Sequence, residues 1–242
     1  MKGMKFRKPF ILLAFMAILL SGCMYPNERK AENQMPIDQQ VALVQEAIDR
    51  YREETSVLPI ATKEAETPIY EKYVIDFSKL IPQYIPYIPG AAFEQGGSFL
   101  FVLTNVETQP TVRLLDLKLI HEVGDIQSRV NYYHEKNKSL PVAGVVRPGY
   151  FQIDFKRIGV KEEKGSIQSP VTGDALPVIM SVTGQVGIDY QTDLEKISQS
   201  TRDLPAPKGD IRDLIPEHSL YVPVKSFPYT YEDEKIVLAS NS

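Results

Sequence analysis

The sequence is poor in the residues that most metal and redox sites use. Its 242 residues include one cysteine and three histidines. A single cysteine excludes an intramolecular disulfide and any zinc or iron–sulfur site that needs several thiolates. The three histidines are His121, His134 and His218, and no two of them have the i, i+4 spacing of a helical metal site. We therefore expect no metal and no cofactor.

Signature motifs of catalysis are also missing. The chain contains no G-x-S-x-G nucleophile elbow, no S-x-x-K, no H-E-x-x-H and no phosphate-binding G-x-x-x-x-G-K-[ST]. A catalytic site needs convergent groups of particular types, and no motif of this sequence supplies them.

An excess of positive charge is missing as well. Lys and Arg total 27 against 31 Asp and Glu, which gives a formal charge of −4. No surplus of cations is available to neutralise phosphates, so nucleic acid is not an expected partner. With 43% hydrophobic and 24% charged residues, the composition is that of a globular protein rather than a disordered or fibrous one.

The apolar run near the N-terminus is too short to cross a membrane. It covers residues 10–20, whereas a spanning helix needs about 20 residues. Basic residues and no acidic ones precede it: Lys2, Lys5, Arg7 and Lys8. This arrangement is typical of a secretory signal peptide, which we assign to residues 1–22.

The apolar run ends in Leu-Ser-Gly-Cys at residues 20–23. This sequence resembles the bacterial lipobox at all four positions. The resemblance implies cleavage between Gly22 and Cys23 and attachment of a diacylglycerol to the Cys23 thiol. Two acyl chains hold a protein stably at a membrane, whereas one is marginal. The alternative is an ordinary signal peptide followed by a chance cysteine.

Removal of residues 1–22 would leave an acidic protein. That segment carries four positive charges and no negative ones, so the mature chain has 23 basic and 31 acidic residues and a net charge of −8. Charge would not draw such a domain to anionic lipid headgroups. We expect the lipid to anchor it and the polar residues 23–36 to form a short lipidated tether.

The rest of the chain contains an internal repeat. Three pairs of segments match in the same order: 47–60 with 129–142, 73–80 with 151–158, and, more loosely, 99–106 with 176–183. The offsets of 82, 78 and 77 residues drift slightly, as small loop deletions would produce. We therefore predict a tandem duplication, with a first unit at 37–120 and a second at 121–198.

The C-terminal residues 199–242 have two interpretations. Residues 210–227 resemble residues 76–93 without a gap, which indicates a partial third copy. Proline-rich loops also converge by chance, in which case this part is a C-terminal extension.

The sequence pattern of each unit predicts a helix followed by antiparallel strands. In the first unit an apolar stripe marks the helix, which the Leu58-Pro59 pair ends; the stripe is Val41, Val44, Ile48 and Tyr51. In the second unit we expect Asp125 to cap the helix. Alternating or apolar segments predict strands: 73–77, 99–106 and 112–119, then 150–157, 176–183 and 185–190. Few helices separate successive strands, which favours an α+β fold with antiparallel sheet.

Two aspartates occupy equivalent places in the repeated segments. Asp76 and Asp154 each stand between an isoleucine and a phenylalanine. If the repeats bring them together, they form an acid pair that could work as catalytic groups. Otherwise each points outward and pairs at the surface with Lys79 or Arg157, for little energy. We expect the second arrangement, and hence a protein that is not an enzyme.

Two proline- and tyrosine-rich runs, 81–93 and 221–231, are the most unusual parts of the chain. Such segments are pre-extended and carry rigid amphipathic rings, as recognition surfaces do. They predict an interaction surface made of Tyr84, Tyr87, Phe93, Tyr221, Phe227 and Tyr229. The alternative is a pair of extended loops laid across the domain with their tyrosines buried.

The lipobox, the acidic mature chain and the two Leu-Pro repeats together resemble the YphF-type lipoproteins of Bacillus-like Gram-positive bacteria. The resemblance implies a lipid-anchored domain on the extracytoplasmic face of the cell membrane. It implies no activity and no functional residue beyond Cys23.

We expect a non-catalytic interaction or scaffolding module of the cell envelope, with another envelope protein or a wall polymer as partner. The alternative is a small-ligand-binding accessory lipoprotein of a transport system, with its ligand between the two units.

Overall fold

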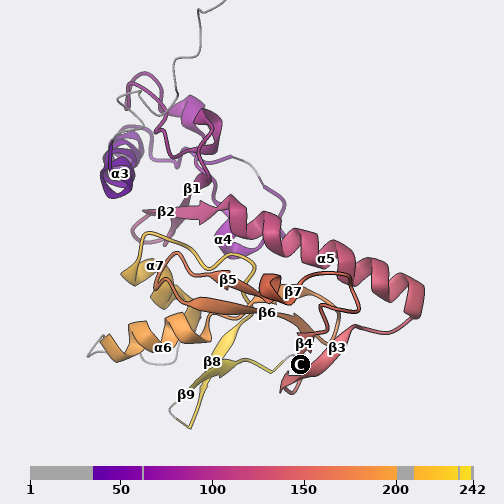
Figure 1. The fold of residues 1–242 in the computed structure, drawn as a ribbon. Coiled ribbons are helices and arrows are strands. Elements are labelled where there is room, and N and C mark those ends of the chain that lie inside the picture. Colours follow the sequence, from indigo (N-terminus) through magenta and orange to yellow (C-terminus); the bar gives the residue numbers. More distant parts are fainter. Residues whose placement is uncertain (1–34, 62, 201–209, 234, 241–242) are drawn as a thin grey trace, which may run out of the picture. The chain divides into compact units, whose positions relative to one another are not determined.

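The computed structural model describes residues 35–61, 63–200, 210–233 and 235–240. Gly22, Cys23, the predicted signal peptide and nearly all of the predicted tether lie outside the described residues. Residues 1–36 and 37–242 are separate units, and the fold below is that of the second. It mixes helices with antiparallel strands (Figure 1), so the α+β prediction is confirmed.

The N-terminal part combines a long helix with a β-hairpin. Its elements are α3 (Ile37–Thr55), α4 (Ile69–Lys72), the 3-10 helices η2 (Phe77–Lys79) and η3 (Phe93–Gln95), β1 (Phe99–Thr104) and β2 (Thr111–Asp116). Val41, Val44 and Ile48 of α3 are buried, as the apolar stripe predicts. β1 and β2 pair antiparallel, with Phe101 opposite Leu114.

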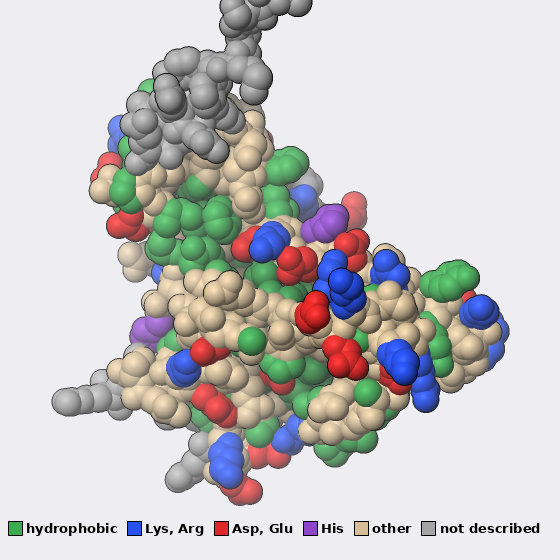
Figure 2. Space-filling model, viewed as in Figure 1, with side chains coloured by type: hydrophobic (Ala, Val, Ile, Leu, Met, Phe, Trp, Pro, Cys, Tyr) green, Lys and Arg blue, Asp and Glu red, His purple; other side chains and the backbone are tan. Residues whose placement is uncertain are grey.

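The following part is built around a five-stranded antiparallel sheet. It contains α5 (Leu117–Asn137), β3 (Val142–Arg147), β4 (Tyr150–Ile153), η4 (Glu162–Gly165), β5 (Ser166–Gln168), β6 (Ala175–Ser181), β7 (Val186–Ile188) and α6 (Gln191–Ser200). The strand order is β3-β4-β6-β5, with β7 also paired to β6. Helix α5 lies along this sheet (Figure 1), and its exposed side carries charges of both signs (Figure 2).

The C-terminal part is short. It consists of η5 (Ile211–Asp213), α7 (Leu214–His218), β8 (Tyr229–Glu232) and β9 (Lys235–Leu238), and the two strands form a separate hairpin. Among the described residues, no helix is both long enough and apolar enough to cross a bilayer.

The hairpin β1–β2 is shared between two hydrophobic cores. Phe101 and Leu103 point into a core with α3, while Val102 points into the core of the five-stranded sheet. On β2, Leu114 joins the first core and Leu115 the second. Successive side chains of a strand face opposite sides, so a strand buried on both faces has a continuous apolar sequence. This explains the run Phe-Leu-Phe-Val-Leu at 99–103.

Matching hydrogen bonds recur after each Leu-Pro pair. The Ile60 amide donates to the Leu58 carbonyl at 2.9 Å, and the Val142 amide donates to the Leu140 carbonyl at 3.0 Å. The amides of the two equivalent aspartates likewise donate to the carbonyls of the two equivalent prolines, Asp76 to Pro59 at 2.8 Å and Asp154 to Pro141 at 2.7 Å.

A glutamine on each long helix makes the same set of contacts. The Gln45 Oε1 atom accepts from the Val112 amide at 2.8 Å, and its Nε2 donates to the Pro110 carbonyl at 3.0 Å. The Gln127 Oε1 atom accepts from the Val186 amide at 2.7 Å, and its Nε2 donates to the Gly184 carbonyl at 2.9 Å. Gln45 and Gln127 are 82 residues apart, the offset of the first sequence match. These recurrences are what a duplication requires; the duplication itself stays a prediction.

Replacing either glutamine by alanine should destabilise the protein to a similar extent. Each change removes three hydrogen bonds, one of them to the side chain four residues further along the helix, and leaves a strand amide, that of Val112 or Val186, without its acceptor. We expect a loss of about 1–3 kcal/mol for Gln45→Ala and for Gln127→Ala, measured by urea unfolding. Losses that differ severalfold between the two variants would contradict the structural equivalence of the two glutamines.

Residues 219–227, here called the C-terminal strap, bind the last strand of each predicted unit. The Leu114 amide donates to the Leu220 carbonyl at 2.8 Å, and the Ile188 amide donates to the Lys225 carbonyl at 2.8 Å. Both contacts are parallel bridges, one to β2 and one to β7. The strap therefore joins the two parts of the fold.

Three local predictions were wrong. The helix of the second unit begins at Leu117 with Asp116 as its N-cap, not at Asp125, so the expected strand 112–119 ends at Asp116. Residue 120, where the first predicted unit ends, lies inside α5; the division into two units stays a prediction. The expected strand 73–77 is reduced to isolated bridges at Val74 and Ile75, because Asp76 caps η2 and turns the chain.

Candidate functional site

The six residues of the predicted interaction surface do not form one exposed surface. Tyr84, Phe227 and Tyr229 are buried, and Tyr87 and Tyr221 are half-buried. Only Phe93 is well exposed, at 60%. The prediction is therefore wrong for the run 221–231, which belongs to the strap and to β8.

Specific contacts accompany the burial of these rings. The Tyr84 hydroxyl donates to Glu54 at 2.7 Å, which raises the pKa of Tyr84. The Phe227 ring packs edge-on against a buried tyrosine of β4, Tyr150, with centroids 5.0 Å apart. The Tyr229 hydroxyl donates to Asp189 at 2.7 Å. The rings thus fill the cores, as the alternative interpretation of the tyrosine-rich runs expects.

The equivalent aspartates are each engaged within their own turn. Asp76 Oδ1 accepts from the Ser78 hydroxyl at 2.6 Å, a bond that lowers the pKa of Asp76, and Asp76 forms an ion pair with Lys79 at 3.6 Å. Asp154 pairs with Arg157 at 3.0 Å. Both carboxylates thus make the surface ion pairs expected for the non-catalytic arrangement.

The histidines are exposed and scattered. His121 lies 3.7 Å from Asp125 on the same helix, and His134 and His218 are also on the surface. Among the residues that the structure describes, no group of three or more histidine, cysteine or acidic side chains could hold a metal ion.

A buried carboxylate that the sequence did not indicate lies on α6. Asp193 is fully buried and accepts hydrogen bonds from the hydroxyls of Ser169 at 2.6 Å and Thr172 at 2.5 Å. An aspartate in the first turn of a helix is usually an exposed charge, so the sequence does not indicate that Asp193 is buried. Its contacts fix the loop after β5 to α6.

The stability of the protein should depend on the ionisation of Asp193. Burial raises the pKa of this carboxyl above its ordinary value of 3.8, and Asp174 adds to the rise, while Ser169, Thr172 and Lys196 oppose it. A raised pKa means that the folded state holds the proton more tightly, so this contribution is lost as the pH rises through the folded-state pKa. Relative to Asp193→Asn, the wild type should therefore lose free energy of unfolding between acidic and neutral pH. A difference that is constant with pH in chemical unfolding would contradict this.

An open apolar groove is lined by residues 74–78 together with residues of the first proline-rich run. It has a volume of about 560 Å³ and is lined by Ala61, Val74, Ile75, Asp76, Phe77, Ser78, Ile81, Ile88 and Glu94. Phe93, the exposed member of the predicted surface, directly precedes Glu94. We call this feature the 81–94 groove. It lies entirely within the first predicted unit.

The backbone around the groove is tightly held. Gln40 of α3 accepts from the Ala91 amide at 2.8 Å, and Gly96 ends η3 in the left-handed conformation with φ of 82°. A Cβ at Gly97 would lie 2.1 Å from the Ala91 carbonyl oxygen, so only glycine fits there. The ring of Phe93 is therefore exposed on a fixed turn.

Comparison with known proteins connects the groove to a family domain. No curated protein and no solved structure matches the chain. Residues 37–116 match the model of the YphF family N-terminal domain. The matched segment ends at Asp116, the N-cap of α5, and contains the whole lining of the 81–94 groove. This similarity supports a YphF-type protein.

Proposed function

We propose that the protein is a lipoprotein anchored through Cys23 on the extracytoplasmic side of the cell membrane, and that it works as a non-catalytic interaction module. The lipobox at residues 20–23 and the preceding apolar run support the anchor. The 81–94 groove carries the interaction part of the proposal. An open apolar groove beside an exposed aromatic ring is typical of a surface that binds a partner.

The chemistry of the groove favours a protein partner over a polysaccharide. Most of its lining is aliphatic or aromatic, and among the residues that the structure describes its only charged side chains are Asp76 and Glu94. Apolar walls gain free energy by covering apolar side chains, whereas a hydroxyl-rich polymer would lose hydrogen bonds with water there. The partner is therefore an envelope protein that offers an apolar segment.

The anchor is tested by the variant Cys23→Ser in the natural host or a related bacterium. The wild type should incorporate labelled fatty acid and sediment with membranes. The variant should incorporate none and leave the membrane fraction. A wild-type protein that carries no lipid would contradict the proposed anchor, but it would not bear on the proposed role of the groove.

The groove is tested by photocrosslinking in intact cells. A photoreactive phenylalanine analogue at position 93 should form a protein adduct, whereas the same analogue at position 132 should not. Tyr132 is a matched control because it is an aromatic residue of α5 with 68% exposure and does not line the groove. Ile88→Asp should abolish the adduct at position 93. Equal amounts of adduct at positions 93 and 132, or no adduct at position 93, would contradict the proposal that the groove binds a protein partner.

A further inference from the structure

The charges of the chain are unevenly distributed between its segments. Residues 129–164 carry eight lysines and arginines against four acidic residues, a net charge of +4. The mature chain would carry −8 in all, and taking away the +4 of this segment leaves −12 for the rest. An asymmetry of sign on this scale is typical of a surface that meets a charged partner. We call residues 129–164 the basic segment.

Six exposed cations of the basic segment come from two elements that pack together. They are Arg129, Lys136 and the C-cap Lys138 of α5, and Lys156, Lys161 and Lys164 in the chain that follows β4. A hollow of about 380 Å³ between the two elements is lined in part by Arg129, Lys161 and Lys164. Figure 2 shows lysine and arginine side chains over α5 and at its C-terminal end. The six cations therefore form one surface, here called the basic surface.

The hollow in this surface is not built to hold one small anion. Glu122, Asp125 and Glu163 line it as well, and Glu122 pairs with Lys118 at 3.9 Å. A single anion inside the hollow would lie close to these carboxylates. An extended polyanion, in contrast, gains affinity from every cation that it passes, because each contact releases a condensed counter-ion. The charge excess therefore favours a long anionic ligand over a small one.

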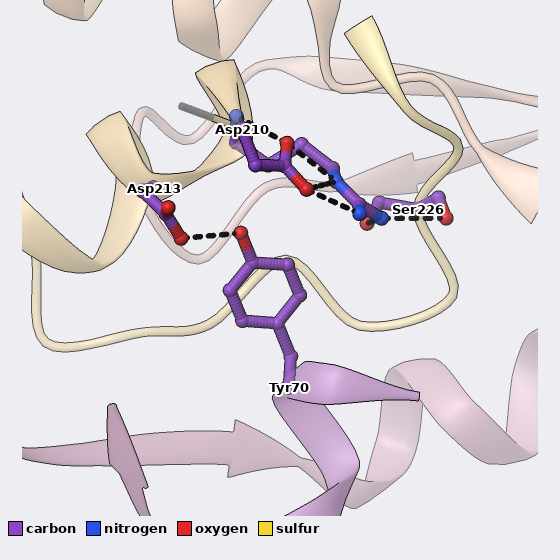
Figure 3. Close-up of polar contacts among 5 residues, drawn as sticks. Tyr70, Asp210, Asp213 and Ser226 are labelled. Atoms are coloured by element: carbon purple, nitrogen blue, oxygen red, sulfur yellow. Dashed lines mark hydrogen bonds and ion pairs between the residues drawn. The ribbon is translucent and has the colours of Figure 1, made fainter. Parts of the chain in front are cut away.

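A cation outside the basic segment shows how such a charge is neutralised within the fold. Arg212 donates to Asp210 through Nε at 2.9 Å and to the Ser226 hydroxyl through Nη1 at 3.1 Å (Figure 3). Within the basic segment, Arg157 pairs with Asp154 at 3.0 Å. Among the described residues, no carboxylate lies within ion-pair distance of the six cations of the basic surface. Their charge is therefore available to an anionic ligand.

An exposed tyrosine lies between two of these cations. Tyr132 is 68% exposed. It follows Arg129 by three residues and precedes Lys136 by four, so the three side chains are neighbours on one face of α5. Among the described residues, Tyr132 belongs to neither hydrophobic core, whereas the next residue, Tyr133, packs against one of them. An exposed ring of this kind can cover the C–H groups of a ligand, so the basic surface offers an apolar contact as well as cations.

The basic surface lies far from the point at which the domain begins. Figure 1 shows α3 and the C-terminal end of α5 at opposite ends of the fold. Helix α3 begins at Ile37, directly after the predicted tether. An anchor at Cys23 would therefore join the domain at α3 and leave the basic surface on the side away from the membrane. This step rests on the proposed anchor, whereas the charge and the exposed ring do not.

We propose that the basic surface binds a phosphate-bearing polymer of the cell wall, with its six cations at the phosphates and the ring of Tyr132 against the carbon chain. An uncharged polysaccharide would leave the cations unused, and a bare chain of phosphates would leave the ring unused. The charge of −12 on the rest of the mature chain repels the same polymer, which confines it to this surface. The 81–94 groove and its protein partner form a separate site.

Binding is tested by calorimetric titration of the full chain, purified from membranes in a non-ionic detergent. Poly(glycerol phosphate) should bind, and its affinity should fall at least tenfold between about 50 and 200 mM salt, because the salt competes for the phosphates. Uncharged dextran should not bind at either salt concentration. No binding of poly(glycerol phosphate), equal binding of dextran, or an affinity that does not change with salt would overturn the proposal.

Charge variants locate the binding on the basic surface. Arg129→Gln combined with Lys136→Gln should weaken the binding of poly(glycerol phosphate) about tenfold at low salt. The matched control is Lys63→Gln combined with Lys118→Gln, which removes the same charge from exposed positions outside the basic segment and should change binding less than about twofold. Glu163→Gln removes a carboxylate from the hollow and should strengthen binding. All five side chains are exposed, so the melting temperature should stay that of the wild type. Equal effects of the two double variants would refute the site.

The ring of Tyr132 is tested separately. Tyr132→Ala should weaken the binding of poly(glycerol phosphate) about fivefold and leave the binding of inorganic polyphosphate, which has no carbon chain, unchanged; equal losses with both probes would contradict the contact. In intact cells, a photoreactive analogue at position 132 should carry a ladder of polymer lengths. A single shift of the size of a lipid would assign the surface to the membrane and overturn the proposal. None of these results bears on the lipid at Cys23 or on the protein adduct at position 93, so the proposals fail separately.

Discussion

Phe227→Ala is expected to cost about 3–5 kcal/mol of the free energy of unfolding. Phe227 is 3% exposed, and its ring packs against Tyr150 of β4 at 5.0 Å. It also lies over the backbone of Gly187 in β7. Truncation would leave a cavity where the strap meets the five-stranded sheet, and surrounding atoms refill such a cavity only in part. The loss would be a large fraction of the stability of a typical domain, about 5–15 kcal/mol.

The matched control is Phe93→Ala, which removes the same ring from an exposed turn. We expect its free energy of unfolding to stay within about 0.5 kcal/mol of the wild type. Chemical unfolding of the three proteins measures both effects. Equal destabilisation by the two changes, or none by Phe227→Ala, would mean that the strap does not occupy the place described. The pair also separates a buried aromatic residue from one that is free to meet a partner.

Gly187→Ala is expected to destabilise the protein by about 3 kcal/mol, the upper part of the range for overpacking. A Cβ at this position would lie 2.6 Å from the Lys225 carbonyl oxygen and 2.7 Å from the Phe227 ring. The Lys225 carbonyl accepts from the Ile188 amide at 2.8 Å, so it cannot retreat without breaking the bridge between strap and β7. The backbones approach so closely that only glycine fits.

Gly124→Ala on α5 gives the opposite expectation. Nothing lies within 4 Å of a Cβ at this position, and alanine in a helix is favoured over glycine by about 0.5–1 kcal/mol. Thermal unfolding should therefore show a lower melting temperature for Gly187→Ala and a slightly higher one for Gly124→Ala. A shift in the same direction for both variants would contradict the close contact at Gly187.

Much of the secondary structure could be predicted because its signals are local. The apolar stripe of α3 repeats at helical spacing, and the turn after Thr104 separates two apolar runs that pair as β1 and β2. The predicted start of α5 was wrong because the sequence offers two acceptable N-cap residues, Asp116 and, later in the chain, Asp125. Asp116 caps the helix because β2 ends there, a fact that only strand pairing establishes.

The candidate sites were less predictable because they depend on which segments meet. The run 81–93 contributes Ile81 and Ile88 to the groove and carries the exposed Phe93. The run 221–231 is also rich in proline and tyrosine, yet Phe227 and Tyr229 are buried in the core of the five-stranded sheet. The buried Asp193 accepts from the hydroxyl of Ser169, which lies 24 residues earlier in the chain, and no local pattern predicts that contact.

The sequence by itself determined the α+β class and the helix and hairpin of the first predicted unit. It also determined the similarity between the segments around Leu58-Pro59 and Leu140-Pro141. These features follow from side-chain periodicity and turn chemistry, which act over a few residues. Tertiary structure alone decided which aromatic residues are buried, how β1 and β2 serve two cores, and that the Asp193 carboxylate is buried. Burial and charge pairing are properties of contacts between distant segments, and identical local sequences can meet different neighbours.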